Sequence, residues 1–322
     1  MIAFHFDPHA LPLPPGHRFP IGKYGRLKAR LEADPGGIVL RESGPASPGE
    51  LALAHDPSYI ADVLDGTLAP AIQREIGFDW SPALARRATH SVGATIAAAR
   101  QALADGVSAS LGGGTHHATA SQGSGYCVFN DVAVAAHLMQ AERHRTHRAG
   151  LQVVVIDLDV HQGNGTAAIF ADDPSVFTFS MHGERNFPFR KHAGDLDVGL
   201  PDGCTDEPYL AALEPALDEV WRRLAARPPG LAFYVAGADP HEGDRLGRLK
   251  LSAAGLARRD EIVLDALQAR AVPAVVLMAG GYGHDVETTV GVHLRTLGIA
   301  ARTQASWPSG STGGRASHTM AR

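Results

Sequence analysis

Residues 153–166 read VVVIDLDVHQGNGT, an apolar run that ends in alternating polar residues. An unbroken apolar run predicts a strand that is buried on both faces, because a strand with one wet face would alternate. Asp157, Asp159 and His161 follow at a spacing of two, so their side chains point the same way where the strand ends. Two carboxylates and an imidazole in a dry setting are costly unless a cation lies among them. The stretch therefore predicts a buried strand with a cation site at its carboxyl end.

Four further apolar runs have strand character: SASLGGG near residue 108, SVFTFSM at 175, LAFYVAGAD at 231 and AVVLMAGG at 274. Helical patterns alternate with these runs, at residues 82–105, 130–142, 205–226, 252–270 and 286–302. This alternation is typical of an α/β fold, a single domain with a mostly parallel multi-stranded sheet and helices on both faces. In such sheets ligands bind at the carboxyl ends of the strands, and the polar residues between positions 157 and 161 lie at such an end.

No linker rich in proline and glycine divides the 322 residues, so one folded domain is expected over residues 1–302. Residues 303–322 are small, polar and rich in glycine, and this composition predicts a disordered C-terminal tail.

The composition argues against several classes of partner. Lys and Arg number 29 against 34 for Asp and Glu, a formal net charge of −5 with no basic run, so direct binding of nucleic acid is not expected. The two cysteines, Cys127 and Cys204, have no paired spacing, which is typical of a reducing compartment. No signal-peptide pattern or membrane-spanning apolar segment is present in the sequence. We therefore expect a cytoplasmic protein without a membrane partner, and the composition does not define an oligomeric state.

A second strand end supports a metal site. The run LAFYVAGADPHEGD also ends in an acid, Asp239, and a set of Asp159, His161 and Asp239 leaves coordination open for water and substrate, as a catalytic zinc site does. Taken alone, the DxDxH pattern is equally compatible with a structural role, in which one aspartate caps the next helix and the histidine makes hydrogen bonds within a loop. Oxygen and nitrogen ligands without a thiolate suit Zn²⁺ and also Fe²⁺.

Two other strand ends carry groups that can move protons. His116 and His117 are adjacent and follow a glycine-rich strand end, and near a metal they become candidates for general base and acid. Adjacent histidines in a loop are otherwise ordinary surface residues. Tyr282 follows two glycines at a further strand end, where its hydroxyl could donate to a developing oxyanion, although a core aromatic is common there. Asp157 could hold one of the two histidines.

Together the motifs GGGTHHA, GYCVFND, DLDVHQGNG, GADPHEGDRLG and AGGYG, in this order, resemble the histone deacetylase superfamily. These are zinc-dependent acyl-amide hydrolases with an arginase-like α/β fold. The resemblance runs from the GHRFPIGKY segment to about residue 300, and HQGNG and EGDRLG are most similar to class IV deacetylases and their bacterial relatives. It implies that residues 1–302 form a deacetylase-like catalytic domain.

The resemblance also implies a role for each motif residue. One zinc ion per chain would be held by Asp159, His161 and Asp239, with Fe²⁺ as an alternative, and a structural potassium ion would lie near Asp157 and Ser180. The remaining implied catalytic residues are His116 and His117 as the acid and base pair, Tyr282 as oxyanion donor, Asp157 as the partner of His116, and Asn164. The implied substrate contacts are Gly125 through its carbonyl, Tyr126 and Phe187 beside a narrow channel, and Gly281.

In one position the chain departs from many members of the family. Asn164 stands where a second aspartate often partners the other histidine, and a neutral partner should leave His117 less basic than a carboxylate would. This favours His117 as general base, while the division of labour between the two histidines stays open. A basic residue that some members place beneath the site aligns with either Arg18 or Lys23.

The resulting hypothesis is hydrolysis of an acyl group, acetyl or longer, from acyl-lysine in a peptide or protein or from a related acylated small amine. An acetylpolyamine amidohydrolase is one alternative within the same chemistry. A ureohydrolase with two metals is another, but it needs a further carboxylate and residue 163 is Gly. A non-hydrolytic binding module for acyl-lysine is the third.

Overall fold

The computed structural model describes residues 1–6, 11, 13–14 and 16–308. Eight strands form one sheet in the order β2-β1-β3-β8-β7-β4-β5-β6, and every neighbouring pair is parallel. The strands are β1 Ile2–His5, β2 Val39–Glu42, β3 Val107–Ser110, β4 Val153–Asp157, β5 Val176–Gly183, β6 Leu196–Leu200, β7 Leu231–Val235 and β8 Ala274–Leu277.

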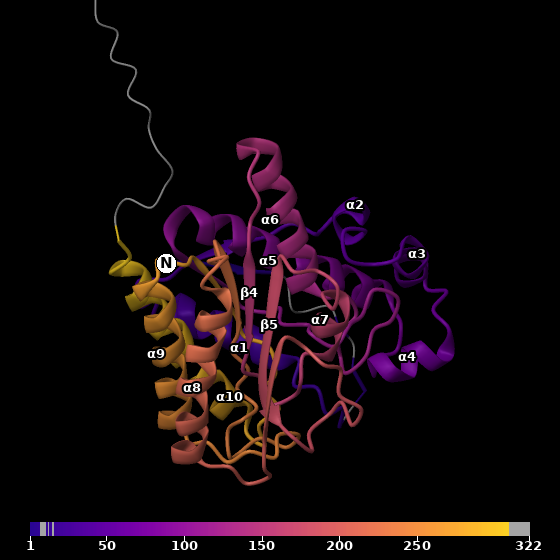
Figure 1. The fold of residues 1–322 in the computed structure, drawn as a ribbon. Helices are drawn as coiled ribbons and strands as arrows, with labels where there is room; N and C mark the ends of the chain where they lie inside the picture. Colours follow the sequence, from indigo (N-terminus) through magenta and orange to yellow (C-terminus); the bar gives the residue numbers. More distant parts are fainter. Residues whose placement is uncertain (7–10, 12, 15, 309–322) are drawn as a thin grey trace, which may run out of the picture.

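Helices cover both faces of this sheet, as Figure 1 shows for α8, α9 and α10 on one side and α5 and α6 on the other. The helices are α1 Gly22–Ala33, α2 Pro48–Leu51, α3 Pro57–Asp65, α4 Pro70–Ile76, α5 Pro82–Asp105, α6 Asp131–His147, α7 Asn164–Ile169, α8 Asp206–Leu224, α9 Ala253–Ala269 and α10 Val286–Ala305. The predicted three-layer α/β arrangement is confirmed, with a sheet that is parallel throughout.

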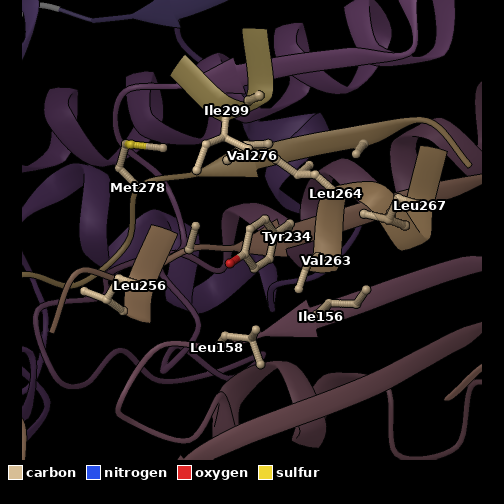
Figure 2. Packing of buried hydrophobic residues seen from close by; sticks show 14 of the residues in the cluster. Ile156, Leu158, Tyr234, Leu256, Val263, Leu264, Leu267, Val276, Met278 and Ile299 are labelled. Carbon is tan, nitrogen blue, oxygen red and sulfur yellow. The ribbon is translucent and has the colours of Figure 1, made fainter. Parts of the chain in front are cut away.

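The central strands β3, β8, β7, β4 and β5 are buried at every position, because helices cover both faces of the sheet. In β4, Val154 and Ile156 belong to the core beneath α8, α9 and α10, whereas Val153 and Val155 belong to the core beneath α5 and α6. Figure 2 shows the first of these cores, where Ile156 of β4 faces apolar residues of α9. Successive residues of a central strand therefore point into the two different cores, and neither set of side chains faces solvent.

The five strands and five long helices expected from the sequence all form. Three strands were not predicted, namely β1, β2 and β6. These strands lie at or next to the edges of the sheet, and β2 and β6 are largely exposed, so they lack a continuous apolar run. Ser81 caps the start of α5, because its side chain accepts a hydrogen bond from the Leu84 N–H. Pro82 occupies the first turn, where a missing N–H costs nothing.

The domain extends beyond the boundary predicted at residue 302. Helix α10 continues to Ala305, and the Gln268 side chain of α9 donates to the carbonyls of Thr303 (3.1 Å) and Ser306 (2.9 Å). A tail that begins at residue 303 is therefore wrong for residues 303–306, because side-chain hydrogen bonds from α9 hold them on the domain. The remainder of the predicted tail, residues 309–322, lies outside the described residues. In the part of the chain that the structure describes, no helix is long and apolar enough to cross a membrane.

Candidate active site and metal centre

Three potential metal ligands converge at the carboxyl ends of two paired strands. Asp159 and His161 follow β4, and Asp239 follows its neighbour β7. His161 Nδ1 lies 3.0 Å from Asp159 Oδ1 and 3.1 Å from Asp239 Oδ2, and all three side chains are buried. Within residues 1–6, 11, 13–14 and 16–308 this is the one group of three or more such side chains whose ligand atoms lie close enough to share an ion.

The negative charges of this cluster favour a bound cation. Burial and the neighbouring Asp159 charge raise the pKa of Asp239 to about 7. Burial would lower the pKa of His161, but hydrogen bonds to Asp159 and Asp239 and their charges raise it to about 10. Without a metal, protons therefore compensate the two carboxylates. One nitrogen and two carboxylate oxygens are a donor set that fits a divalent ion such as Zn²⁺ or Fe²⁺, which would displace those protons.

Backbone N–H groups and glycines fix how the carboxylates point. The Gly280 N–H donates to Asp159 Oδ2 at 2.8 Å, and the Val160 N–H donates to Asp239 Oδ1 at 3.0 Å. A Cβ atom at Gly280 or at Gly237 would overlap carboxylate oxygens of both Asp159 and Asp239. The loops after β7 and β8 therefore need glycine at these two positions to approach the ligands.

The surroundings of His116 favour its protonated form. Its Nδ1 atom donates to Asp157 Oδ2 at 2.6 Å, and both side chains are buried. Burial alone would lower the pKa of His116, but the charges of Asp157 and Asp159 outweigh burial and raise that pKa to about 9. The expected pairing of Asp157 with His116 is therefore present in the structure.

The ring of His117 lies next to that of His116, with the two centroids 4.1 Å apart, and its surroundings favour the neutral form. Burial, and then the charges of His116 and His161, hold the pKa of His117 well below its usual range. Its Nδ1 atom lies 2.7 Å from Asn164 Oδ1, at the start of α7. Because an amide oxygen only accepts, the proton resides on Nδ1, and Nε2 is left with a free lone pair. One histidine can thus take a proton while the other can give one.

Replacing Asn164 by Asp is expected to make activity more sensitive to acid. A carboxylate 2.7 Å from Nδ1 would raise the pKa of His117, since an opposite charge at that distance favours the imidazolium. A base must be unprotonated to act, so activity would be lost as the pH falls through the raised pKa. The measurement is the pH profile of kcat/KM for Asn164→Asp, with Asn164→Ser as the neutral control. An acidic limb at the same pH in both variants would contradict this role of Asn164.

Tyr282 follows β8 in a loop with unusual backbone angles. Ala279 has a φ of 49° and Gly281 a φ of 148°, and the Tyr282 N–H donates to Asp244 Oδ2 at 2.6 Å. The Tyr282 ring lies 6.2 Å from the ring of His161, centroid to centroid. Burial and the charges of Asp239 and Asp159 raise the pKa of the Tyr282 phenol well above its usual range. Its hydroxyl therefore stays protonated and can donate a hydrogen bond.

The structure distinguishes the two basic residues that the sequence left as alternatives. Lys23, in α1, is buried and its Nζ atom donates to the carbonyls of Ala279 (3.0 Å) and Gly281 (3.3 Å), beneath the loop that carries Tyr282. Arg18 is exposed, and its backbone carbonyl accepts from the Arg245 side chain. Lys23 is thus the residue beneath the site.

One pocket is lined by both histidines, by Tyr282 and by two of the three potential metal ligands, Asp159 and His161. Tyr126 lines it and packs against Phe19 and Phe78, with ring centroids 5.2 Å away in both cases. Phe187 packs edge-on against His117 at 4.9 Å. Gly125 also lines the pocket and has a φ of 53°. Tyr126, Phe187 and Gly125 are therefore near the catalytic pair, as the resemblance implied.

Gly281 is the one expected substrate contact that faces elsewhere. Its carbonyl is engaged by Lys23, and a Cβ atom there would meet Thr289 and Ala238. The pocket wall is formed by Gly280 and Tyr282 on either side of it. Gly281 is not among the pocket-lining residues, and its φ of 148° is a backbone conformation that favours glycine.

The position that would hold a second metal ligand has no room for one. A Cβ atom at Gly163 would overlap Asp157 Oδ2. Asp157 lies opposite Ser180 in the pairing of β4 with β5, and both line a small cavity together with Thr178 and Asp197. This cavity is where the resemblance places potassium.

Arg87, in α5, lines the same pocket as the catalytic residues and was not anticipated from the sequence. Its guanidinium stacks on Tyr24 at 4.4 Å, and its Nη1 atom has no hydrogen-bond partner among the residues that the structure describes. An arginine one residue after Arg86 in a helix gives no sign of burial, so only the tertiary packing reveals it. Arg87 offers a positive charge inside the pocket.

Comparisons with known proteins agree with this geometry. A family model described as the histone deacetylase domain matches residues 17–297. Histone deacetylase 2 of Arabidopsis thaliana is 33% identical, over 83% of this chain and 70% of its own. An uncharacterized protein of Picosynechococcus sp. is 42% identical, over 91% and 95% of the two chains. Acetoin utilization protein AcuC of Bacillus subtilis is 32% identical, over 70% and 61%.

Among solved structures, an HDAC homolog complexed with SAHA is 25% identical with a TM-score of 0.78, over 94% of this chain and 84% of that one. The fold and the family model define an α/β hydrolase of the deacetylase type. The chain belongs to the histone deacetylase family, whose members are hydrolases that act on amide bonds.

Proposed function

We propose that this protein is a zinc-dependent deacylase that hydrolyses the amide of acyl-lysine or of a related acylated amine. The observation that carries this proposal is the arrangement of two adjacent histidines with different partners, His116 on Asp157 and His117 on Asn164, beside the potential ligands Asp159, His161 and Asp239. Acid and base in opposite protonation states are what hydrolysis of an amide requires, since water must lose a proton and the amine must gain one.

The roles of the chain's own groups follow from their geometry. Zinc held by Asp159, His161 and Asp239 would polarise the amide carbonyl and lower the pKa of water towards ~7. His117 Nε2 takes the proton of that water, and His116 supplies a proton to the departing amine. The Tyr282 hydroxyl donates to the oxygen on which negative charge develops. Asp157 and Asn164 keep the two imidazoles in orientation and protonation state.

The walls of the pocket support an acyl group as the bound part of the substrate. Beside the catalytic residues they include apolar side chains, namely Leu84, Ala88, Val128 and Phe129. Gly125, Tyr126 and Phe187 would contact the acylated amine as it enters. The partly buried Arg87, whose Nη1 atom has no partner among the described residues, would offer its charge to the carboxylate that hydrolysis releases.

A substrate panel tests the proposal. Acetyl- to myristoyl-lysine peptides would be compared with acetylputrescine and acetylspermidine, and turnover of at least one acyl-lysine peptide is the expected result. Turnover of the acylpolyamines alone would replace acyl-lysine by a small amine as carrier. Binding of acyl-lysine peptides without release of the acyl group would favour the binding module and overturn the hydrolase.

Replacing Tyr282 by Phe is expected to lower kcat by about 10²–10³-fold, the usual effect of losing one oxyanion donor. KM should change little, because the hydroxyl acts mainly on the charge that develops during the reaction. Equal kcat values for Tyr282→Phe and the unaltered protein would remove Tyr282 from the mechanism.

Metal counting tests the stoichiometry that separates this proposal from a ureohydrolase. We propose one zinc ion per chain, because Gly163 leaves no room for a further ligand. Emission spectroscopy should give one equivalent of zinc, with Fe²⁺ as the other metal that this donor set suits. Two equivalents of a transition metal would contradict the deacylase. A potassium ion beside Asp157 and Ser180 is part of the proposal and would be counted separately.

A further inference from the structure

A fully buried arginine lies behind the proposed metal centre. Arg259 is in α9, and its side chain reaches the carboxyl edge of the sheet. One nitrogen, Nη1, donates to two backbone carbonyls, those of Leu158 at 3.2 Å and Gly237 at 2.8 Å. Leu158 directly precedes Asp159, and Gly237 lies two residues before Asp239. Arg259 therefore bridges the two chain segments that carry the carboxylate ligands.

The bridge begins where the sheet stops. The register between β4 and β7 ends at the pair Asp157 and Val235, and the Leu158 N–H makes one further bond to the Val235 carbonyl at 3.0 Å. Beyond this point the strands no longer bond to each other through Leu158 O and Gly237 O. Buried carbonyls need a donor, and the guanidinium supplies one to both. Arg259 thereby joins the backbones of the two ligand-bearing segments.

Asp260 balances the charge of Arg259 and holds its guanidinium in place. Asp260 Oδ1 lies 2.9 Å from Nε and 2.8 Å from Nη2, so the pair is neutral. Asp260 also accepts from the Tyr234 hydroxyl at 2.5 Å and from Thr296 Oγ1 at 2.6 Å. Figure 2 shows Tyr234 and Leu158 within this core, beside residues of α9. Strand β7 and helices α9 and α10 thus hold the guanidinium in place.

We propose that Arg259 is a positioning residue for the metal centre, which sets the spacing of Asp159 and Asp239 by binding the backbone before each. The ion pair with Asp260 fixes the guanidinium and does not itself touch the ligands. This inference rests on the proposed metal site, and it adds a determinant of metal affinity that lies outside the ligand set. Groups that orient ligands from behind commonly change metal affinity by about 10–100-fold when removed.

The test compares three variants by zinc affinity, measured by competition with a chromophoric chelator. Arg259→Met with Asp260→Asn removes both charges together, so that no lone charge is left buried. Arg259→Lys retains the charge but cannot offer the planar guanidinium that pairs with Asp260 while reaching both carbonyls. Arg258→Met is the matched control, since Arg258 is the preceding residue on α9, exposed and paired with Glu261. Circular dichroism and metal-free unfolding midpoints report on folding.

The zinc Kd of the double variant is expected to rise by about 10–100-fold and that of Arg259→Lys by a smaller factor, with Arg258→Met unchanged. The absorption spectrum of the cobalt-substituted site should shift in the first two variants alone. A folded double variant whose zinc Kd is within twofold of the unaltered protein would overturn the proposal. If the double variant does not fold, a Kd for Arg259→Lys equal to that of the unaltered protein would overturn it instead. An unaltered protein that binds no zinc would overturn the metal site itself, so the two failures are distinct.

Discussion

The Asp239→Asn protein is expected to lose nearly all hydrolytic activity, with kcat/KM lower by about 10³–10⁴-fold. Asp239 is fully buried and supplies one of the two carboxylates of the proposed metal centre. The amide keeps the size of the side chain but removes its charge, so the metal is held more weakly. Losing the metal removes several kcal/mol of transition-state stabilisation, and each 1.36 kcal/mol is tenfold in rate. Zinc content after dialysis should fall together with activity.

Asp202 provides the matched control for this substitution. It is exposed and pairs with Arg248 on the surface, so Asp202→Asn should leave both zinc content and kcat/KM unchanged. An Asp239→Asn protein that retained a full equivalent of zinc and full activity would show that Asp239 is not a ligand.

The His117→Ala protein is expected to retain its metal but to lose about 10²–10⁴-fold in kcat, the range that general base catalysis provides. His117 donates from Nδ1 to Asn164, and its free Nε2 atom is the only part that would meet the water. KM should change less than kcat, because proton removal belongs to the transition state. The measurement is steady-state kinetics alongside zinc content.

His144 offers a comparison within the same chain, because it is exposed on α6 and distant from the pocket residues. His144→Ala should match the unaltered protein in kcat. If His117→Ala kept its kcat within about tenfold, below the smallest effect expected of a general base, another group would have to remove the proton.

The ligand set could be predicted from the sequence because it depends on local rules. Strand periodicity places Asp157, Asp159 and His161 on one side of the chain, and parallel strands bring Asp239 to the same edge. The buried strands β4, β7 and β8 could be predicted because their apolar runs are nearly continuous, and β3 and β5 because small or β-branched residues alternate with apolar ones between helical segments. The motif resemblance then gave Asn164 and His117 as partners, and their side chains lie 2.7 Å apart.

Other features depend on contacts between segments that are far apart in the sequence. Lys23, Arg87 and Arg259 are cations on helices, and in a sequence they are indistinguishable from exposed residues such as Arg258. Lys23 binds carbonyls 256 and 258 residues away, and Arg259 binds carbonyls just after the ends of two different strands. The outer strands β2 and β6 are largely exposed, and their sequences lack a continuous apolar run. Tertiary packing supplies what the local pattern lacks in each case.

Titration of the metal-free protein with Zn²⁺, while hydrolysis of an acyl-lysine peptide is followed, tests the proposed function most directly. The site formed by Asp159, His161 and Asp239 predicts that activity rises linearly and reaches its plateau at one equivalent per chain. Turnover that does not respond to zinc, or that requires two equivalents, would contradict a deacylase with a single metal centre.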